Sequence, residues 1–490
     1  MLGWPACRGT GIRCPDLRTR PEVAGLGPPT LTTDSAKESG SPLAPPAEPP
    51  APPEPSLRSK AVRGSVWTFG AFGAQKVIAF GNSVVLRWFL VPEVFGLMYL
   101  VQGVLRGLAM FSDFGIQPAV VQNPRGDERN FLDTAWSMQV ARGVLLCLVA
   151  AAAGWPLSLI YEEGAVLVWL MLAMSAIPLL EGFISTSLFT LQRHLEIKKL
   201  RLFELGVSTA GVAVAIVLAW WTRSIWAIVA GAWTATVLKV GFSYALTRDA
   251  GNRFAWNRSA VKELFHFGKW IFMATAVGFV AGHADGFILG KALDMTMLGI
   301  YATALRATEV VDDLVTTQTH SVLFPAFCQV GRESQERLRS VYYRVRLRVD
   351  ALFLPALGGL FVTSDWLIGL LFDESYSLAG WMLKFLCIRT AMGVVLTPCE
   401  TCLFSMGHTR YGLYRNVARA VWVVAAVPAG FWLAGLDGML LAVALSEVPV
   451  LLVLWPAFRR IGLLDVRREL IAPMLFGAGM LLGTAFLAVV

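Results

Sequence analysis

Apolar stretches of twenty or more residues recur along this chain, and short polar segments separate them. A helix needs ~20 apolar residues to cross the ~30 Å hydrocarbon layer of a membrane, so each stretch predicts a spanning helix. The pattern predicts spans near residues 65–90, 94–122, 131–155, 165–191, 201–221, 225–247, 264–291, 296–328, 347–371, 378–405, 411–434, 438–458 and 469–490. The fold class predicted is therefore an all-α polytopic membrane protein.

Between the eighth and ninth spans, residues 337–346 combine arginines with apolar residues at helical spacing. This pattern predicts a cationic amphipathic helix that lies on the inner leaflet. The alternative is a cytosolic extension of the ninth span.

Three of the spans have polar residues along one face. Residues that follow one another at steps of three and four share a face of a helix. The first span has Gly73, Lys76, Phe80, Ser83 and Arg87; the second has Gln102, Arg106, Ala109, Asp113 and Gln117; the eighth has Arg306, Glu309, Asp313, Thr316 and His320. Lipid cannot solvate such a face, so the three are predicted to meet across a central, inward-accessible cavity.

A weak internal repeat organises the spans. A shift of 203 residues aligns 65–101 with 268–304 and matches Trp67 with Trp270 and Gly96 with Gly299. Both copies begin a series of six spans, which predicts two six-helix lobes of like orientation, a parallel repeat common in transporters. The predicted domains are a disordered Pro-rich tail at 1–57, an N-terminal lobe at 58–247, a C-terminal lobe at 248–458 and an extra helix at 459–490.

The composition agrees with a membrane protein and argues against two other classes, a nucleic-acid-binding protein and a disulfide-stabilised protein. Only 16% of the residues are charged, whereas soluble domains average about 25%. The net charge of +8 comes from basic loops, which predict a cytoplasmic N-terminus by the positive-inside rule and no affinity for nucleic acid. The seven cysteines lie in the tail or within apolar helices, so they imply no disulfide framework, and no metal-binding cluster or enzyme motif is present.

One segment indicates a family. The sequence FSDFGIQPAVVQ (Phe111–Gln122), which follows LVPEVFGLMYL, resembles the signature of Wzx-type oligosaccharide flippases. These are polysaccharide biosynthesis exporters of the multidrug/oligosaccharidyl-lipid/polysaccharide superfamily, and the resemblance covers roughly residues 62–458. Members of this superfamily have two six-helix lobes around a central cavity. Relatives usually have twelve or fourteen helices in all, whereas thirteen are predicted here.

The resemblance implies a transporter and not an enzyme. Its expected substrate is an undecaprenyl-pyrophosphate-linked oligosaccharide, moved across the inner membrane for surface polysaccharide assembly. Its expected partners are membrane lipids, a polysaccharide polymerase and glycosyltransferases. No cofactor is expected apart from a coupling proton or Na⁺.

The buried charges then receive candidate roles. A pyrophosphate needs cations to replace its water, and the substrate-binding candidates are Lys76, Arg106, Arg142 and Arg306. The coupling-ion candidates are Asp285, Glu309 and Asp313. The alternative for each cation is a structural ion pair: Arg306 with Glu309, Arg142 with Glu181, and Arg106 with an acid on a neighbouring helix.

Two other functions remain open on the sequence. A multidrug exporter of the same superfamily would share the fold, although cationic drugs favour an acidic or aromatic cavity over these basic faces. An integral-membrane polymerase or glycosyltransferase would need sizeable outer loops for its catalytic groups, and the external turns here have about ten residues or fewer.

Overall fold

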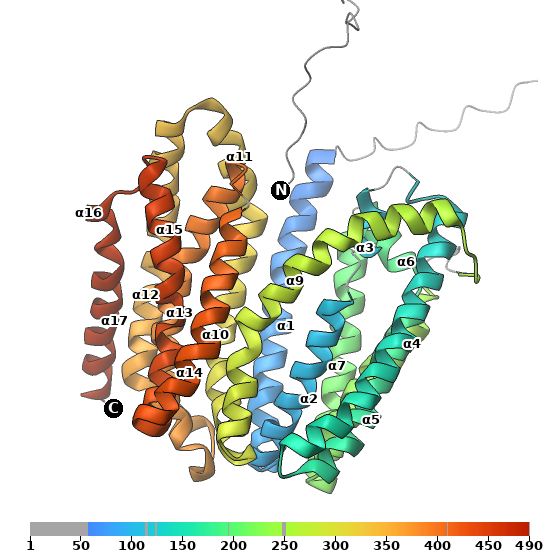
Figure 1. The fold of residues 1–490 in the computed structure, drawn as a ribbon, viewed down its shortest axis with the longest axis horizontal. Coiled ribbons are helices and arrows are strands. Elements are labelled where there is room, and N and C mark those ends of the chain that lie inside the picture. The colour runs from blue at the N-terminus through green and yellow to red at the C-terminus, as the bar shows by residue number, and fades with distance from the viewer. Residues whose placement is uncertain are drawn as a thin grey trace, which may run out of the picture. The chain divides into compact units, whose positions relative to one another are not determined.

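The computed structural model describes residues 57–112, 116–122, 125–194, 196–246, 251–408 and 410–489. Nearly all of the predicted tail at 1–57 lies outside these residues, and Leu57–Val490 forms one compact unit. The described residues contain no strand, which confirms the all-α fold class (Figure 1). The helices are α1 Leu57–Phe89, α2 Pro92–Phe111, α3 Ile116–Gln122, α4 Arg129–Ile160, α5 Gly164–Gly182, α6 Ser187–Arg193, α7 Ile197–Thr222, α8 Trp226–Ser243, α9 Arg258–Ala292, α10 Met295–Gln318, α11 Phe324–Glu333, α12 Gln335–Leu371, α13 Leu378–Ser405, α14 Arg410–Ala444, α15 Val448–Arg460, α16 Val466–Glu469 and α17 Ile471–Leu487.

Nine helical segments among the described residues are long and apolar enough to cross a membrane. One of them, Arg410–Arg460, contains two of the predicted spans. The three remaining predictions correspond to α1, α9 and α10, which have 33, 35 and 24 residues. These three helices are long enough to span, but they contain charged residues, among them Lys76, Asp285 and Arg306. In a membrane those side chains must face protein or a cavity and not lipid.

Three predicted spans are interrupted in the structure. The span at 94–122 is wrong as a single helix, because α2 ends at Phe111 and a separate helix α3 begins at Ile116. The span at 165–191 likewise divides into α5 and α6. In the third, a π-helical turn at Thr319–Leu323 separates α10 from α11. The polar face predicted for 102–117 therefore stops at the end of α2, and Gln117 lies on another helix.

The structure decides two other predictions about the C-terminal part of the chain. Residues 337–346 belong to the continuous helix α12, so they extend the ninth span and the separate surface helix is wrong. The cytosolic side of this extension stays a prediction. Helix α14 reverses at Ala434-Gly435, where Gly435 has a φ of +60° that favours glycine. The indole of Trp422 then donates to Ala442 O at 2.9 Å across this hairpin, which agrees with two spans at 411–434 and 438–458.

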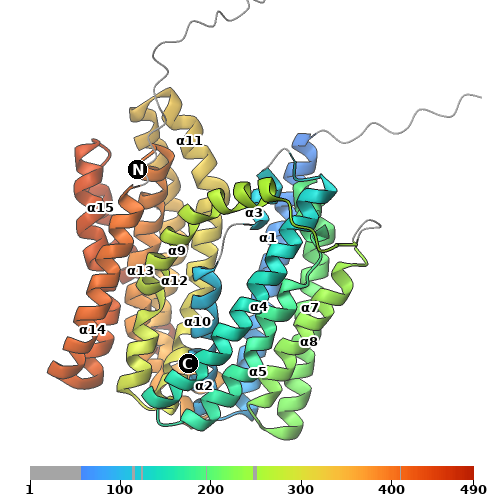
Figure 2. The same ribbon diagram turned by 45° about the vertical axis from the view of Figure 1, so that its right-hand side comes forward.

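Helices from distant parts of the sequence pack together at the centre of the unit. Helix α2 packs along α10 and α9, and α9 packs along α14. Figure 2 shows α14 and α15 on one side, α7 and α8 on the other, and α2, α9 and α10 between them. Helices α1 and α9 both run from the upper to the lower end of Figure 1. The lobe boundaries at 247 and 458 stay a prediction, because Leu57–Val490 forms a single compact unit.

The contact between α2 and α10 brings two backbones together. A Cβ added to Gly96 would lie 2.0 Å from the carbonyl oxygen of Met295, and one added to Gly299 would lie 1.8 Å from that of Pro92. No other residue type fits such an approach. These are the same two glycines that the internal repeat aligns, so equivalent helices of the two copies contact each other at equivalent positions.

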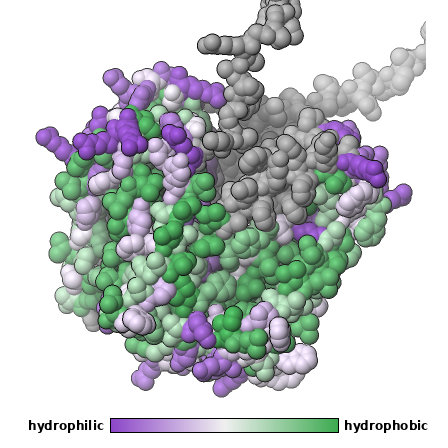
Figure 3. Space-filling view, in the orientation of Figure 1, coloured by the Kyte–Doolittle hydropathy of each residue, from purple (hydrophilic) through white to green (hydrophobic). Residues whose placement is uncertain are grey.

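The surface of the unit is that of a protein surrounded by lipid. Figure 3 shows hydrophobic residues across the middle of one face, with hydrophilic residues gathered toward the two ends. Large apolar side chains remain exposed on many helices, as expected where lipid replaces water. The exposed side chains include Trp88, Trp155, Trp220, Trp221, Trp226, Trp366 and Trp432, and tryptophan is a residue type that favours membrane interfaces.

Candidate functional site

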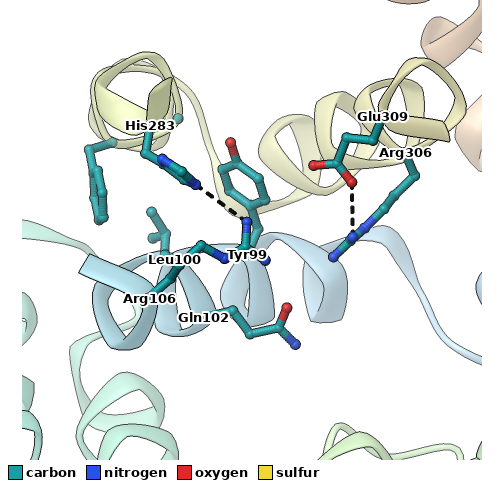
Figure 4. A pocket seen from close by; sticks show the side chains of 10 residues that line it. Tyr99, Leu100, Gln102, Arg106, His283, Arg306 and Glu309 are labelled. Atoms are coloured by element: carbon teal, nitrogen blue, oxygen red, sulfur yellow. Dashed lines mark hydrogen bonds and ion pairs between the residues drawn. The ribbon is translucent and has the colours of Figure 1, made fainter. Parts of the chain in front are cut away.

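Three adjoining cavities lie among the helices that have the polar faces. The largest, about 670 Å³, is bounded by α2, α4, α5, α7 and α8. A second of about 280 Å³ lies among α1, α2, α7 and α10. A small pocket between α2, α9 and α10 joins them (Figure 4), because Arg106 lines both it and the largest cavity, while Arg306 and Glu309 line both it and the second.

Arg106 lies at the junction of the small pocket and the largest cavity. Its Nη1 lies 3.3 Å from Nε2 of His283, and the imidazole stacks on Phe279 with ring centroids 4.9 Å apart. No carboxylate among the described residues pairs with Arg106, so the alternative of an ion pair with a neighbouring acid has no support there. The guanidinium is exposed to the cavity and can bind an anion.

The other two substrate-binding candidates on the predicted faces, Lys76 and Arg306, are paired in the second cavity. Lys76 forms an ion pair with Asp313, and Nη1 of Arg306 lies 2.9 Å from Oε2 of Glu309. The pair between Arg306 and Glu309 was the structural alternative from the sequence, and it is present. All four side chains are partly exposed, between 31% and 47%, so neither pair is sealed from a ligand in the cavity.

Arg142 and Asp285 have different surroundings. Nε of Arg142 donates to Ser112 Oγ at 2.9 Å, and its Nη2 donates to Ala109 O at 2.8 Å. These bonds hold Arg142 against the C-terminal end of α2. Arg142 also lines the largest cavity. Asp285 is buried and lines none of the three cavities.

The partners of Asp285 come from helices distant in sequence. Its Oδ2 lies 3.2 Å from Nη1 of Arg389 on α13 and accepts a hydrogen bond from the Tyr301 hydroxyl at 3.0 Å. Arg389 is itself buried. Six of the seven predicted site residues thus line adjoining cavities, and Asp285 lies in a buried polar cluster.

One further cation in the second cavity was not selected from the sequence. Arg87 shares the polar face of α1 with Lys76, and its Nε donates to Thr303 Oγ1 of α10 at 2.8 Å. Its guanidinium lies 4.3 Å from the centroid of the Phe95 ring. The regular spacing from Lys76 was the signal, but that spacing cannot show that Thr303 and Phe95 would immobilise the side chain.

Comparisons with known proteins agree on the family and the fold. The family described as "Polysaccharide biosynthesis protein" matches residues 85–379. The chain is 23% identical to the lipopolysaccharide biosynthesis protein WzxC of Escherichia coli, over 80% of each chain. It is 24% identical to the succinoglycan biosynthesis transport protein ExoT of Rhizobium meliloti, over 79% of this chain and 77% of that one.

Solved structures give the same fold at low sequence identity. The lipid II flippase MurJ in an inward closed conformation matches with a TM-score of 0.65 and 11% identity, over 87% of this chain and 98% of that one. An inward-facing multidrug resistance MATE transporter of the MOP superfamily matches with a TM-score of 0.63 and 14% identity, over 79% and 94%. The chain has the fold of these transporters, and it belongs to the polysaccharide biosynthesis protein family.

Proposed function

We propose that this protein is a flippase that moves an undecaprenyl-pyrophosphate-linked oligosaccharide across the inner membrane for surface polysaccharide assembly. The observation that carries the proposal is the set of cations, Lys76, Arg106, Arg142 and Arg306, around connected cavities inside a membrane-spanning unit. The names of WzxC and ExoT, which refer to lipopolysaccharide biosynthesis and succinoglycan transport, support a glycan substrate.

The pyrophosphate is proposed to bind at the small pocket between α2, α9 and α10. Moving its charges out of water requires other groups that solvate them. Arg106 offers a guanidinium whose observed neighbour is an imidazole and not a carboxylate. Arg306 reaches the same pocket on its other side, where Glu309 is its present partner. A phosphate that displaces Glu309 would gain a bidentate guanidinium contact.

The largest cavity is proposed to receive the sugars. Its volume of about 670 Å³ lies within the range of small-molecule sites. Amide and carboxylate side chains, including Gln117, Gln139 and Glu181, line it together with apolar residues. Sugar hydroxyl groups need such donors and acceptors to replace water. The lipid tail need not enter, because apolar chains are stable in the surrounding bilayer.

Ion coupling would follow from the pairing in the second cavity. When a phosphate takes Arg306, the carboxylate of Glu309 loses its cation and becomes a site for a proton or Na⁺. Asp313, paired with Lys76, would respond in the same way. Asp285 stays a coupling candidate, although its bonds to Arg389 and Tyr301 make it the least accessible of the three.

Alternating access is proposed to use the two repeated halves. The direct packing of Gly96 against Gly299 and the common direction of α1 and α9 support a parallel repeat. Basic residues at the ends of α12, α15 and α16 support a cytoplasmic N-terminus through the positive-inside rule. A polymerase and glycosyltransferases that make and consume the glycan remain the proposed partners.

The test replaces Arg106 and Arg306 singly with Gln and measures membrane abundance and surface glycan in cells that depend on this gene. Normal abundance with lost glycan is the expected result for both variants. Arg332→Gln, at an exposed position on α11, is the matched control and should leave glycan unchanged. Normal glycan from both cavity variants would contradict the proposal, whereas lost abundance would assign the arginines to folding.

A further inference from the structure

A second cluster of charges lies outside these cavities, where α12 packs against α16 and α17. Its centre is Arg346, which is only 3% exposed and forms an ion pair with Glu469 of α16. The hydroxyl of Tyr343 donates to Glu469 at 3.0 Å and accepts from the backbone N–H of Asp465 at 2.7 Å. These bonds fix α16 to the side of α12.

Several polar atoms of this cluster lack hydrogen-bond partners. Nε and Nη2 of Arg346 and Oδ1 of Asp350 are buried and bond to no described atom, although Nε lies 3.2 Å from Oδ2 of Asp350. Buried polar groups without hydrogen-bond partners are rare, because burying them unpaired is unfavourable. Both residues line a cavity of about 260 Å³.

The rim of the cavity favours an anion. Arg344 and Arg468 join Arg346 in its lining, which gives three guanidinium groups. Arg344 is exposed and has no ion-pair partner among the described residues. The guanidinium carbon of Arg468 lies 5.3 Å from the centroid of the Tyr343 ring. Its Nε lies 3.4 Å from Oδ2 of Asp465. Asp350 is the acid in the lining, and Arg346 pairs with it, so an anion would bind toward Arg344 and Arg468.

The opposite side of the same cavity is apolar. Leu347 and Ile471 complete the lining, and Leu347 is 44% exposed. Met474, one turn further along α17, is 73% exposed. Helix α12 has 37 residues, a length of about 55 Å at 1.5 Å per residue. It exceeds the ~30 Å hydrocarbon layer, so its first turns, where this cavity lies, reach the headgroup region.

We propose that this cavity binds the phosphate of an anionic phospholipid, with the acyl chains along the exposed apolar face of α12 and α17. Basic pockets between spanning helices bind such headgroups. Arg459, Arg460 and Arg467 are close in sequence to Arg468 of the cavity. By the positive-inside rule, these basic residues indicate the cytoplasmic leaflet. The binding of lipid here does not depend on the transport function proposed above.

The test uses the full chain purified in a neutral detergent. Short-chain phosphatidylglycerol, short-chain phosphatidylcholine and inorganic phosphate are titrated separately, and the thermal unfolding midpoint is measured. The double variant R344Q/R468Q removes two cations from the rim. R348Q/R460Q removes two exposed arginines that do not line the cavity and is the matched control. R344Q alone, at an exposed unpaired position, serves if the double variant fails to fold.

Phosphatidylglycerol should raise the midpoint of the wild type, whereas phosphatidylcholine should not. R344Q/R468Q should weaken the apparent affinity by on the order of thirtyfold, at about 1 kcal/mol for each cation. The control should retain the wild-type affinity. An equal response to phosphatidylcholine, or an equal loss in the control, would overturn the proposal. A full response to inorganic phosphate at the same concentration would assign the cavity to free phosphate and overturn the lipid.

Discussion

Two groups of charges in this protein differ in their surroundings. In the second cavity, Lys76–Asp313 and Arg306–Glu309 are half-exposed pairs that a ligand can reach. Beside them, Asp285 and Arg389 form a buried pair that Tyr301 completes. An exposed pair contributes little to stability and can exchange partners. A buried pair exchanges with difficulty, because either ion alone is strongly unfavourable. Exposure, and not charge, separates the binding candidates from the structural residues.

The largest expected effect comes from breaking the buried pair. Arg389→Met leaves the Asp285 carboxylate buried without its cation, and this should destabilise the protein by roughly 3–5 kcal/mol. Thermal unfolding in detergent and membrane abundance both measure it. The double variant R389M/D285N removes both charges and should recover part of the loss. A wild-type midpoint for R389M would show that the two groups of charges are equivalent after all.

A smaller effect is expected at the close backbone contact between α2 and α10. Gly299→Val forces side-chain atoms against the backbone of Pro92 and should cost about 1–3 kcal/mol, as overpacking does. Gly477→Ala is the control, because nothing lies within 4 Å of a Cβ at that position. The unfolding midpoint of G477A should match or exceed the wild type. Equal loss in both variants would mean that the close contact is not the cause.

The smallest effect is expected from an exposed pair. Asp313→Asn removes the partner of Lys76 from the cavity and should change stability by no more than about 1 kcal/mol. The thermal unfolding midpoint of the wild type should also change only slightly when salt is added. A loss as large as that of Arg389→Met would contradict the distinction between the two groups, because it would make the cavity pair structural.

The sequence predicted the positions of the long helices well, since span length follows directly from membrane thickness. It also selected the correct faces of α1, α2 and α10, because periodicity alone determines which residues share a face. It did not predict the end of α2 at Phe111, because the span was drawn from hydropathy alone and passed over Ser112, Asp113 and Gly115 between α2 and α3. Hydropathy reports what a segment can be buried in, and it does not report where a helix stops.

The partners of the buried charges were beyond prediction for another reason. Arg389 lies 104 residues from Asp285, and no feature of either segment indicates the other. The sequence paired residues close in the chain, such as Arg306 with Glu309, and that pair is present. Contacts between distant helices depend on the arrangement of the whole bundle, so Asp285 and Glu309 looked alike as coupling candidates although only Glu309 lines a cavity.

The glycine contact between α2 and α10 has a mechanical consequence. Two backbones that touch without side chains between them form a narrow point of support, and a tilt of α2 about it would be multiplied along the helix. Gly96 lies near the start of α2, and the helix continues for fifteen residues to Phe111, about 22 Å at 1.5 Å per residue. A tilt of about 10° at this pivot would move the far end by about 4 Å and the backbone at Arg106, ten residues from Gly96, by about 3 Å. A small rotation where the helices touch would therefore widen the space beside Arg106.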